Sequence, residues 1–248
     1  MGKDGLGGSP AEGALTGSRR SVHGRRIGRP LRKRAQHAVE DVLPRLRLSL
    51  PQTGGFDPAA AFGRPVRAVW LEIGAGNGSH AVWQAARNPD VGVIAVEPFL
   101  NGVAALVAAA AEQGLDNIRV LDDDARLLLA RLPEASIART FILHPDPWPK
   151  RRHWRRRMVC GPVLDQLTRL MPAGAELRVS TDDVGYLVWM LLVLRRHPGF
   201  AWAPRSADDW RRAPADWPQT RFEEKGRAAG RPPTYLSLRR NGRPADEP

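Results

Sequence analysis

An acidic and an aromatic side chain, Asp146 and Trp148, stand in a loop directly after a short apolar run, residues 140–143. Three of the six loop residues, 144–149, are proline, so the chain cannot continue there as a helix or a strand, and the apolar run is predicted to be a buried strand that ends at this loop. Six of the eight residues in 150–157 are Lys or Arg, which makes an anion-binding cluster. We therefore expect chemistry and a polyanionic partner to meet at this loop.

Three glycines, Gly74, Gly76 and Gly78, follow one predicted strand, residues 66–74, and open a predicted helix, residues 79–87. Glycine tolerates positive φ and lets the backbone approach a ligand closely, as cofactor turns between a strand and a helix require. The spacing is GxGxG and differs from the GxGxxG pattern of dinucleotide-binding turns. The turn therefore predicts a cofactor site but does not by itself choose the cofactor.

Three acids near the ends of successive predicted strands indicate which cofactor the turn binds. Glu72 lies at the end of the first strand, where a carboxylate would repel a pyrophosphate but would suit a cationic sulfonium ligand with an α-amino group. Glu97 follows the second strand, 21 residues after Gly76, where it can accept both hydroxyls of an adenosine ribose. Asp124 ends the third predicted strand and can accept the adenine amine, or alternatively cap the following helix. This set favours S-adenosylmethionine over a nicotinamide.

The elements that would position these groups alternate along the chain. The predicted strands cover residues 66–74, 91–97, 118–124, 139–143 and 176–180, and the predicted helices cover residues 79–87, 101–113, 125–132, 158–170 and 184–197. Such alternation requires a parallel sheet with helices on both faces, because each crossover must return to the same edge. Residues 220–240 are predicted to form a loop and a final strand, with Pro232 and Pro233 outside any central strand. The predicted fold class is therefore α/β and Rossmann-like.

The amino-acid composition limits the kinds of partner that the protein is expected to bind. Thirty-eight Lys and Arg against 26 Asp and Glu give a net charge of +12, which indicates a phosphate-bearing partner, either a nucleic acid or an anionic membrane surface. No apolar run reaches the roughly 18 residues that span a bilayer, and the start lacks the apolar core of a signal peptide, so we expect a cytoplasmic protein and no membrane partner. The single Cys160 excludes an internal disulfide and a multi-cysteine zinc site, and no metal site is expected.

The chain divides into a predicted core domain with an added arm. Residues 1–18 are predicted to be a disordered tail, residues 19–60 a basic arm with a helix and a connector, residues 61–241 the main domain, and residues 242–248 a second tail. Residues 19–34 contain eight basic residues and no acid, and lead into a helical repeat over residues 35–46. The basic run is either a solvated tail or an arm that orders on RNA phosphates.

Several separated motifs together resemble one family, the bacterial tRNA (guanine-N7)-methyltransferases. The motifs are the basic residues 25–29, the turn at 71–78, Pro145 to Lys150 followed by the basic residues 151–157, Thr181 and Asp182 with Tyr186, and Thr220 to Glu223 with Gly226. The resemblance covers residues 25–240, nearly all of the chain outside its glycine-rich start. It implies a Rossmann-like S-adenosylmethionine-dependent methyltransferase with a mostly parallel, seven-stranded sheet and helices on both faces. It also implies methyl transfer from S-adenosylmethionine to N7 of guanine at position 46, in the variable loop of tRNA.

The resemblance also implies site residues and a partner. The expected cofactor-binding residues are Glu72, Gly74, Gly76, Gly78, Glu97, Asp124 and Asp146. The expected substrate-binding residues are Lys150, Asp182, Thr220, Arg221, Phe222 and Glu223. The expected RNA-binding residues are Arg25, Arg26, Arg29, Arg152, His153, Arg155, Arg156 and Arg157. The expected partner is tRNA, with no obligate protein partner, and the protein is expected to be a monomer or a homodimer. The chain departs from the family pattern at Pro98, Phe99 and Asn101, at His144, where an aromatic is usual, and in residues 231–235, which lack a common acid.

Guanine N7 carries an exposed lone pair and no proton, so it can attack a sulfonium methyl without a base that first removes a proton. Catalysis then depends on alignment and on electrostatics, because the reaction moves positive charge from sulfur to the base. A carboxylate near the purine accepts hydrogen bonds from N1 and N2 and offsets this charge, and we predict Asp182, then Asp146, as the catalytic residues. Trp148 either stacks on a base or anchors local packing. His153 is predicted to contact phosphate or solvent.

Three other functions remain open from the sequence. A nicotinamide-dependent oxidoreductase would share the fold, but the GxGxG spacing and the basic excess disfavour it. An RNA-binding protein with a decayed methyltransferase fold would not need Glu97, Asp146 and Asp182, which are all present. A methyltransferase that acts on another RNA site would share most of these features. Methylation of an exocyclic amine is disfavoured, because only one proline separates Asp146 from Trp148.

Overall fold

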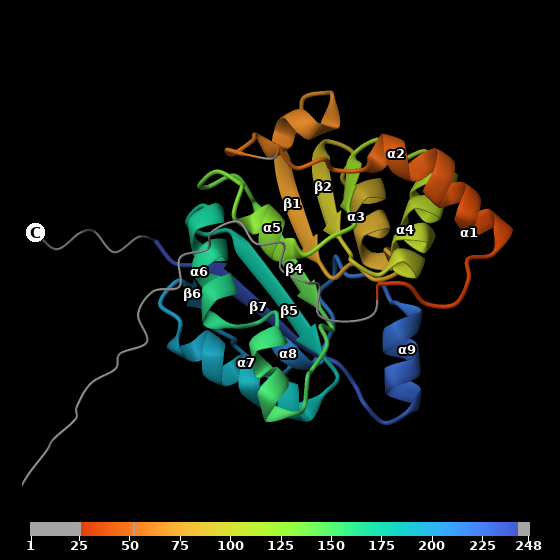
Figure 1. Cartoon of the computed structure of the whole chain (residues 1–248). Coiled ribbons are helices and arrows are strands. Elements are labelled where there is room, and N and C mark those ends of the chain that lie inside the picture. Colours follow the sequence, from red (N-terminus) through yellow and green to blue (C-terminus); the bar gives the residue numbers. More distant parts are fainter. Residues whose placement is uncertain (1–25, 52, 243–248) are drawn as a thin grey trace, which may run out of the picture.

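The structure is a computed structural model, and it describes residues 26–51 and 53–242. Its strands form a seven-stranded sheet in the order β3-β2-β1-β4-β5-β7-β6 (Figure 1). The strands are β1 (Ala68–Ile73), β2 (Val91–Val96), β3 (Ile118–Leu121), β4 (Arg139–Leu143), β5 (Glu176–Thr181), β6 (Phe200–Ala201) and β7 (Thr234–Arg240). Strands β1 to β5 pair in parallel, and β7 runs antiparallel between β5 and β6. The predicted α/β fold with a mostly parallel, seven-stranded sheet is confirmed.

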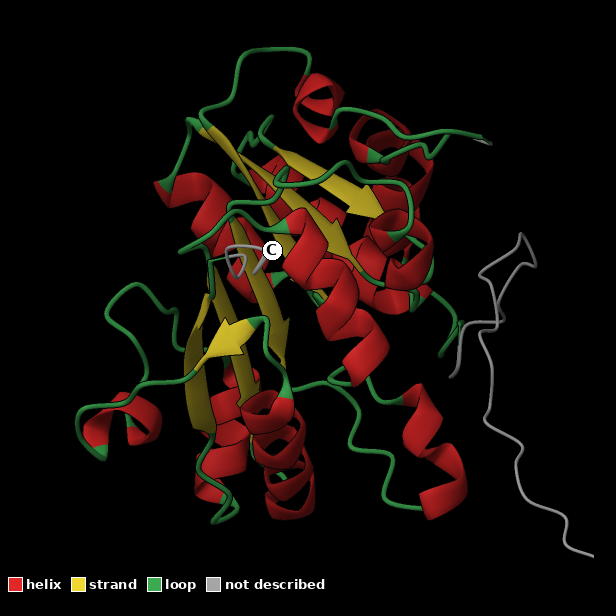
Figure 2. Cartoon of the chain, turned by 90° about the vertical axis from the view of Figure 1, so that its left-hand side faces the viewer, coloured by secondary structure: helices red, strands yellow, loops and turns green. Residues whose placement is uncertain are grey.

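Helices cover both faces of the sheet (Figure 2), so β2 and β5 are buried along their whole length. All six residues of β2 are buried. Val91 and Val93 belong to a core that includes residues of α3 (Ser79–Arg87) and α4 (Leu100–Glu112). Ile94 and Val96 belong to a second core that includes residues of three other helices. These are α5 (Ala125–Leu129), α6 (Gly161–Leu170) and α7 (Val184–Arg196).

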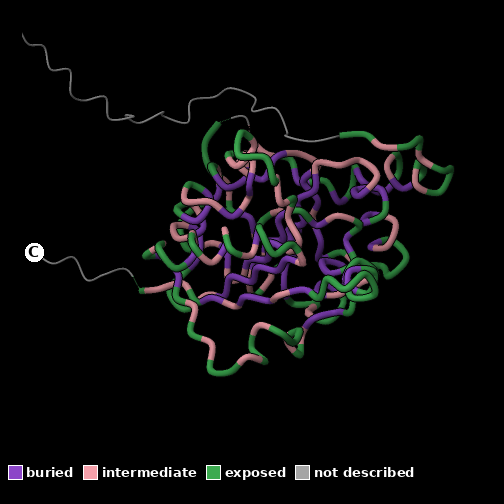
Figure 3. The backbone as a smooth tube through the Cα atoms, turned by 90° about the horizontal axis from the view of Figure 1, so that it is seen from below, coloured by how far each residue is buried: buried purple, intermediate pink, exposed green. Residues whose placement is uncertain are grey.

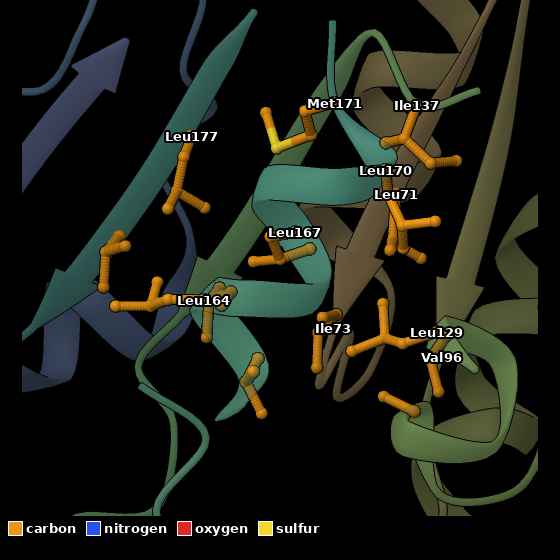
Figure 4. Close-up of a cluster of buried hydrophobic side chains, with 14 of the residues drawn as sticks. Leu71, Ile73, Val96, Leu129, Ile137, Leu164, Leu167, Leu170, Met171 and Leu177 are labelled. Carbon is orange, nitrogen blue, oxygen red and sulfur yellow. The ribbon is translucent and has the colours of Figure 1, made fainter. Parts of the chain in front are cut away.

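The second core is densely packed where α6 crosses the sheet. Leu164, Leu167 and Leu170 of α6 belong to the same core as Leu71 and Ile73 of β1 (Figure 4). Leu167 is fully buried, and burial of such a side chain contributes about 1.5–3 kcal/mol. The buried segments gather at the centre of the molecule, and the exposed segments lie at its periphery (Figure 3). This packing holds the loops that follow β1, β2 and β4 on a rigid frame.

The N-terminal helix predicted over residues 35–46 is present, but it is irregular. It consists of α1 (Lys33–His37), a π-helical turn η1 (Ala38–Val42) and α2 (Leu43–Leu46). Its buried residues Ala38, Val42, Leu43 and Leu46 belong to the same core as α4. The predicted tails, residues 1–18 and most of 242–248, and residues 19–25 of the predicted arm lie outside the described residues.

Two element predictions are wrong, and one predicted helix begins later than expected. The third strand ends at Leu121 and not at residue 124, because the acidic residues after it form the turn into α5. The loop predicted in residues 220–233 contains a helix, α9 (Arg221–Ala228). The helix predicted from residue 158 begins only at Gly161. A short 3-10 helix, η3 (Arg151–Arg156), precedes it and carries most of the basic cluster.

Three short elements complete the described chain. A 3-10 helix, η2 (Pro58–Phe62), precedes β1, and α8 (Asp208–Arg211) lies between β6 and α9. Strand β6 at the sheet edge has two residues, too few for a periodic sequence signal. Within residues 26–51 and 53–242, the structure contains no helix with the length and apolar character needed to cross a membrane.

Candidate active site

A pocket of about 650 Å³ opens at the carboxyl ends of β1, β2 and β4. The strand order reverses direction between β1 and β4, so this is the switch point at which ligands bind in open parallel sheets. The volume lies within the roughly 300–1,000 Å³ of small-molecule sites. Predicted residues that line the pocket are Glu72, Gly74, Gly76, Glu97, Asp124, Asp146, Arg156, Thr220, Phe222 and Glu223. The structure therefore brings together groups that lie far apart in the sequence.

The glycine turn after β1 forms one wall of the pocket. Gly74 and Gly76 have φ values of 78° and 56°, and a Cβ at either position would meet nothing within 4 Å. Gly78 differs, because a Cβ there would lie 2.5 Å from the side chain of Leu106 on α4. Gly74 and Gly76 therefore leave the backbone open to a ligand. Gly78 instead permits α3 to pack closely against α4, and it does not line the pocket.

Glu97 projects its carboxylate into the turn. Its Oε2 accepts the Gly76 amide hydrogen at 2.7 Å, and its Oε1 accepts the Phe99 amide hydrogen at 2.8 Å. Burial raises the pKa of Glu97, and the two amide donors only partly oppose this effect. Each carboxylate oxygen has a second lone pair. The residue is thus held in place by its own backbone neighbourhood and can still accept two further hydrogen bonds, such as those of a ribose diol.

Asp124 performs the capping role that the sequence left open, and it also lines the pocket. Its Oδ1 accepts the Arg126 amide hydrogen at 2.9 Å at the start of α5. The side chain is 6% exposed and faces the guanidinium of Arg126 at 3.4 Å. Capping uses one oxygen, so the second oxygen can still accept a hydrogen bond from a ligand.

The loop at residues 144–149, after β4, is conformationally strained. His144 and Trp148 have φ values of 47° and 41°, in a left-handed region that non-glycine residues rarely occupy. Each such residue costs on the order of 1–3 kcal/mol and persists only where its surroundings enforce it. The Trp148 ring lines the pocket, with the Arg156 guanidinium 4.9 Å from its centre and the His153 ring edge-on at 5.7 Å. Trp148 is therefore packed between basic side chains at the pocket rim.

Arg157 is buried beneath this loop, which corrects its predicted role as an RNA-binding residue. It is 5% exposed, and its side chain donates to the carbonyls of Pro147 and Trp148 at 2.9 and 3.3 Å. Its guanidinium lies 4.9, 5.1 and 4.7 Å from the ring centres of Trp154, Tyr186 and Trp189. Such cation–π contacts compensate the desolvation of the charge. Arg157 therefore supports the loop from within and cannot contact a polyanion at the surface.

A second acidic cluster surrounds His144. Its Nε2 lies 3.3 Å from Glu223 Oε1, and its Nδ1 lies 3.8 Å from Asp182 Oδ1. Burial alone would raise the pKa of Glu223, but hydrogen bonds from His144 and from Trp217 Nε1, the latter at 3.0 Å, hold it below its ordinary value. Asp182 also accepts from Arg231 Nε at 3.2 Å. Asp182 thus lies beside the pocket, next to a histidine that lines it.

Besides Asp182, two other predicted substrate residues do not line the pocket, and four residues on or behind the pocket wall were missed. Lys150 and Arg221 do not line the pocket. His80 and Trp217 line it, and Gln84 and Asp216 support them. Sequence reasoning had one usable signal in this region. Thr220 and Glu223 are spaced as a helix N-cap and its third residue, and the Thr220 Oγ1 accepts the Glu223 amide hydrogen at 3.3 Å. That pattern predicts the start of α9.

Residues 66–236 match a family model described as "Putative methyltransferase". A tRNA (guanine-N(7)-)-methyltransferase of Rhodospirillum rubrum is 48% identical over 90% of this chain and 89% of its own length. The enzyme of the same name from Chelativorans sp. (strain BNC1) is 45% identical over 89% of this chain and 95% of its own length. The chain belongs to the tRNA (guanine-N7)-methyltransferase family. The family resemblance predicted from the motifs is confirmed.

Solved structures support the fold of this family member. The crystal structure of the 16S rRNA methyltransferase KamB matches with a TM-score of 0.53 and 18% identity over 77% of this chain and 95% of that chain. The aminoglycoside resistance methyltransferase NpmB1 matches with a TM-score of 0.52 and 16% identity over 79% of this chain and 98% of that chain. At these identities the likeness concerns the Rossmann-like architecture.

The pocket of this family member fits S-adenosylmethionine, the cofactor expected from the sequence. The open positions beside Gly74 and Gly76 leave room for a ligand against the backbone. Glu97 would hold the ribose, Asp124 the adenine and Glu72 the amino-acid end, because each is a hydrogen-bond acceptor on the pocket wall. All three side chains are carboxylic acids, and such a set suits a cationic cofactor better than a pyrophosphate.

The basic residues predicted to bind RNA lie in two segments near the pocket, the 3-10 helix η3 and the N-terminal arm. Arg152 and Arg155 are exposed on η3. Desolvation and the neighbouring arginines lower the pKa of His153, so it contributes little charge near neutral pH. Arg25 lies outside the described residues, whereas Arg26 pairs with Asp123 at 3.0 Å.

Residues 26–29 of the arm are docked beside the pocket rim. The Gly28 amide donates to Asn101 Oδ1 at 2.8 Å, and Asn101 Nδ2 donates to the carbonyl of Arg29 at 2.9 Å. Gly28 packs so closely that a Cβ would lie 2.7 Å from the Phe99 ring, which lines the pocket. Arg29 itself is exposed. The arm therefore presents a basic side chain close to the cofactor side of the site.

Proposed function

We propose that this protein transfers the methyl group of S-adenosylmethionine to N7 of guanine 46 in the variable loop of tRNA. The observation that carries the proposal is the 48% identity, over 90% of the chain, to a relative named as a tRNA (guanine-N(7)-)-methyltransferase. The geometry supports it, because an acidic pocket suited to a cationic cofactor lies beside the basic residues of η3.

When bound, S-adenosylmethionine supplies an electrophilic methyl group. Glu97, Asp124 and Glu72 bind and orient the two ends of the cofactor, and Asp146 lines the same pocket from the loop after β4. Trp148 and Phe222 give the pocket mouth aromatic surface against which a flipped base can stack. Guanine N7 needs no deprotonation, so these residues act by alignment.

Asp182 is proposed to bind the Watson–Crick edge of guanine. Its side chain is 16% exposed and lies next to His144, with Arg231 on its other oxygen. A carboxylate in this place accepts hydrogen bonds from N1 and N2 and stabilises the positive charge that N7 gains on methylation. Glu223 is almost fully buried and bonded to His144 and Trp217. Its role is therefore to hold His144, and through it the guanine side of the pocket.

The experiment is methyl transfer from labelled S-adenosylmethionine to an unmodified tRNA transcript, followed by cleavage selective for 7-methylguanosine. The proposal predicts cleavage at guanine 46, with Asp182→Asn reducing turnover roughly 100-fold or more and leaving the affinity for S-adenosylhomocysteine within about twofold. Cleavage at another nucleotide would assign the enzyme to a different RNA site. Label without cleavage would mean that another atom is methylated.

A further inference from the structure

A buried row of three side chains leads from α3 to the wall of the pocket. Gln84 Nε2 lies 3.2 Å from His80 Nε2, and His80 Nδ1 lies 2.7 Å from Glu72 Oε2. All three residues are nearly inaccessible, with exposures of 1%, 3% and 2% from Gln84 to Glu72. Glu72 and His80 line the pocket, whereas Gln84 lies behind them. The sequence singled out Glu72 and contained no comparable signal for His80.

The row has a defined direction of hydrogen bonding. The Gln84 amide nitrogen also donates to the carbonyl of Asp216 at 2.9 Å, which fixes the orientation of the amide group. Its other hydrogen points to His80 Nε2, which must therefore be the acceptor nitrogen of the ring. The proton of the neutral imidazole is then on Nδ1, and Nδ1 donates to Glu72. This network thus places a hydrogen-bond donor on one oxygen of the Glu72 carboxylate.

The His80 ring has little freedom to move from this position. Phe141 of β4 packs edge-on against it at 4.6 Å between ring centres, and Trp217 packs at 5.2 Å. Trp217 is itself held by the hydrogen bond from its Nε1 to Glu223. A residue locked by packing and by a further hydrogen bond is suited to fixing the geometry of a ligand-binding carboxylate.

We propose that His80 is a positioning residue, which orients Glu72 so that its carboxylate binds the ammonium group at the amino-acid end of S-adenosylmethionine. The inference rests on the proposed function and deepens it. His80 Nδ1 donates to Oε2 of Glu72, which leaves Oε1 of this pocket-lining residue to accept a hydrogen bond from the ligand. Without the donor at Nδ1, the Glu72 carboxylate would no longer be held in this orientation, and only ligands that carry the ammonium group would be affected.

The test compares two ligands by isothermal titration with the full-length protein. S-adenosylhomocysteine carries the ammonium group, and 5′-methylthioadenosine has the same adenosine and sulfur without the amino-acid end. For His80→Leu we expect the affinity for S-adenosylhomocysteine to fall roughly 10-fold or more, the value of one hydrogen bond to a charged group. The affinity for 5′-methylthioadenosine should change less than about twofold.

A matched pair of variants separates positioning from packing. The amide nitrogen of His80→Asn occupies the place of Nδ1 and should restore the affinity for S-adenosylhomocysteine to within about threefold of the native protein. The amide nitrogen of His80→Gln occupies the place of Nε2, facing away from Glu72, and should behave like His80→Leu. This pair decides the question even if the leucine variant does not fold.

Equal losses for the two ligands, or equal affinities in the asparagine and glutamine variants, would overturn the proposal. If the native protein bound neither ligand, the proposed function would fail instead. The two failures are therefore distinguishable in the same experiment.

Discussion

The side chain of Arg157 donates from Nε to the main-chain carbonyl of Pro147 across 2.9 Å. This hydrogen bond joins a buried cation to the strained loop that carries Asp146 and Trp148, the acid and the aromatic residue at the pocket. Arg157 belongs to the basic run of residues 150–157, which the sequence predicts to be an exposed anion-binding surface. Its position beneath the loop shows that one member of the run is buried and supports the site.

Arg157→Lys is expected to impair catalysis without altering RNA affinity. Lysine keeps the charge but lacks the planar fork that reaches two carbonyls and stacks on aromatic rings. The variant should lose about 2 kcal/mol of stability and roughly 10-fold or more in kcat, with tRNA affinity within about twofold. Thermal unfolding, kinetics and filter binding measure these quantities. The matched control, Arg155→Lys on the exposed side of η3, should change stability by less than about 0.5 kcal/mol. Weaker tRNA binding with normal stability in Arg157→Lys would instead show that Arg157 contacts RNA.

Asn101→Ala is expected to release the arm. Asn101 makes two hydrogen bonds to arm residues, one to the Gly28 amide and one to the Arg29 carbonyl. Their removal takes away about 1–3 kcal/mol of docking free energy, so tRNA should bind several-fold more weakly while S-adenosylhomocysteine binds normally. The control is Gln113→Ala, an exposed residue at the other end of α4. Unchanged tRNA affinity in Asn101→Ala would show that the docked arm does not contribute to RNA binding.

Arg152 and Arg155 are expected to contact phosphates. Replacement of both by alanine should weaken tRNA binding and reduce the slope of log K against log salt by roughly 0.7–0.9 for each phosphate that the protein no longer neutralises. Arg212, which is exposed on the C-terminal side of α8, supplies the control substitution. Affinity measured over a range of salt concentrations gives the slopes. An identical slope in native protein and double variant would mean that this face of η3 is only solvated.

Cofactor affinity is expected to decline in mildly acidic solution because of Glu97. Burial, with Asp146 and Glu72 adding to it, raises the pKa of this carboxyl above its ordinary value of 4.5. In the proposed binding mode the ribose hydroxyls donate to the ionised form, so binding is full above this pKa and is lost as the pH falls through it. The loss therefore occurs at a higher pH than for an ordinary glutamate. Titration of S-adenosylhomocysteine between about pH 5 and 8 should show this dependence in native protein and not in Glu97→Gln. Parallel pH profiles in the two proteins would exclude Glu97 as the group responsible.

The fold and much of the pocket could be predicted because their signals are local. The buried run of β2, the glycines after β1 and Glu97 after β2 each follow from the order of elements in a parallel sheet. The sequence left open whether Asp124 binds adenine or caps the following helix. The structure shows that this side chain caps α5 and also lines the pocket.

The rest depends on contacts between distant segments. Arg157 is buried because Trp154, Tyr186 and Trp189 surround it, and their proximity follows only from how η3 packs on α7. His80 differs little from any polar residue of an amphipathic helix until Phe141 and Trp217 are placed beside it. The helix α9 was not predicted, because the glycines and prolines of residues 226–233 indicated a loop and the capping pattern of Thr220 and Glu223 was not recognised.

The most direct test of the central claim, methylation of guanine N7, uses a tRNA in which 7-deazaguanosine replaces the guanosine at position 46. This base has the same Watson–Crick edge and a carbon in place of N7. The account predicts that the substituted tRNA binds with unchanged affinity and inhibits the reaction of normal tRNA, but accepts no labelled methyl group. Methyl transfer to the substituted tRNA at the rate of the unmodified transcript would contradict it.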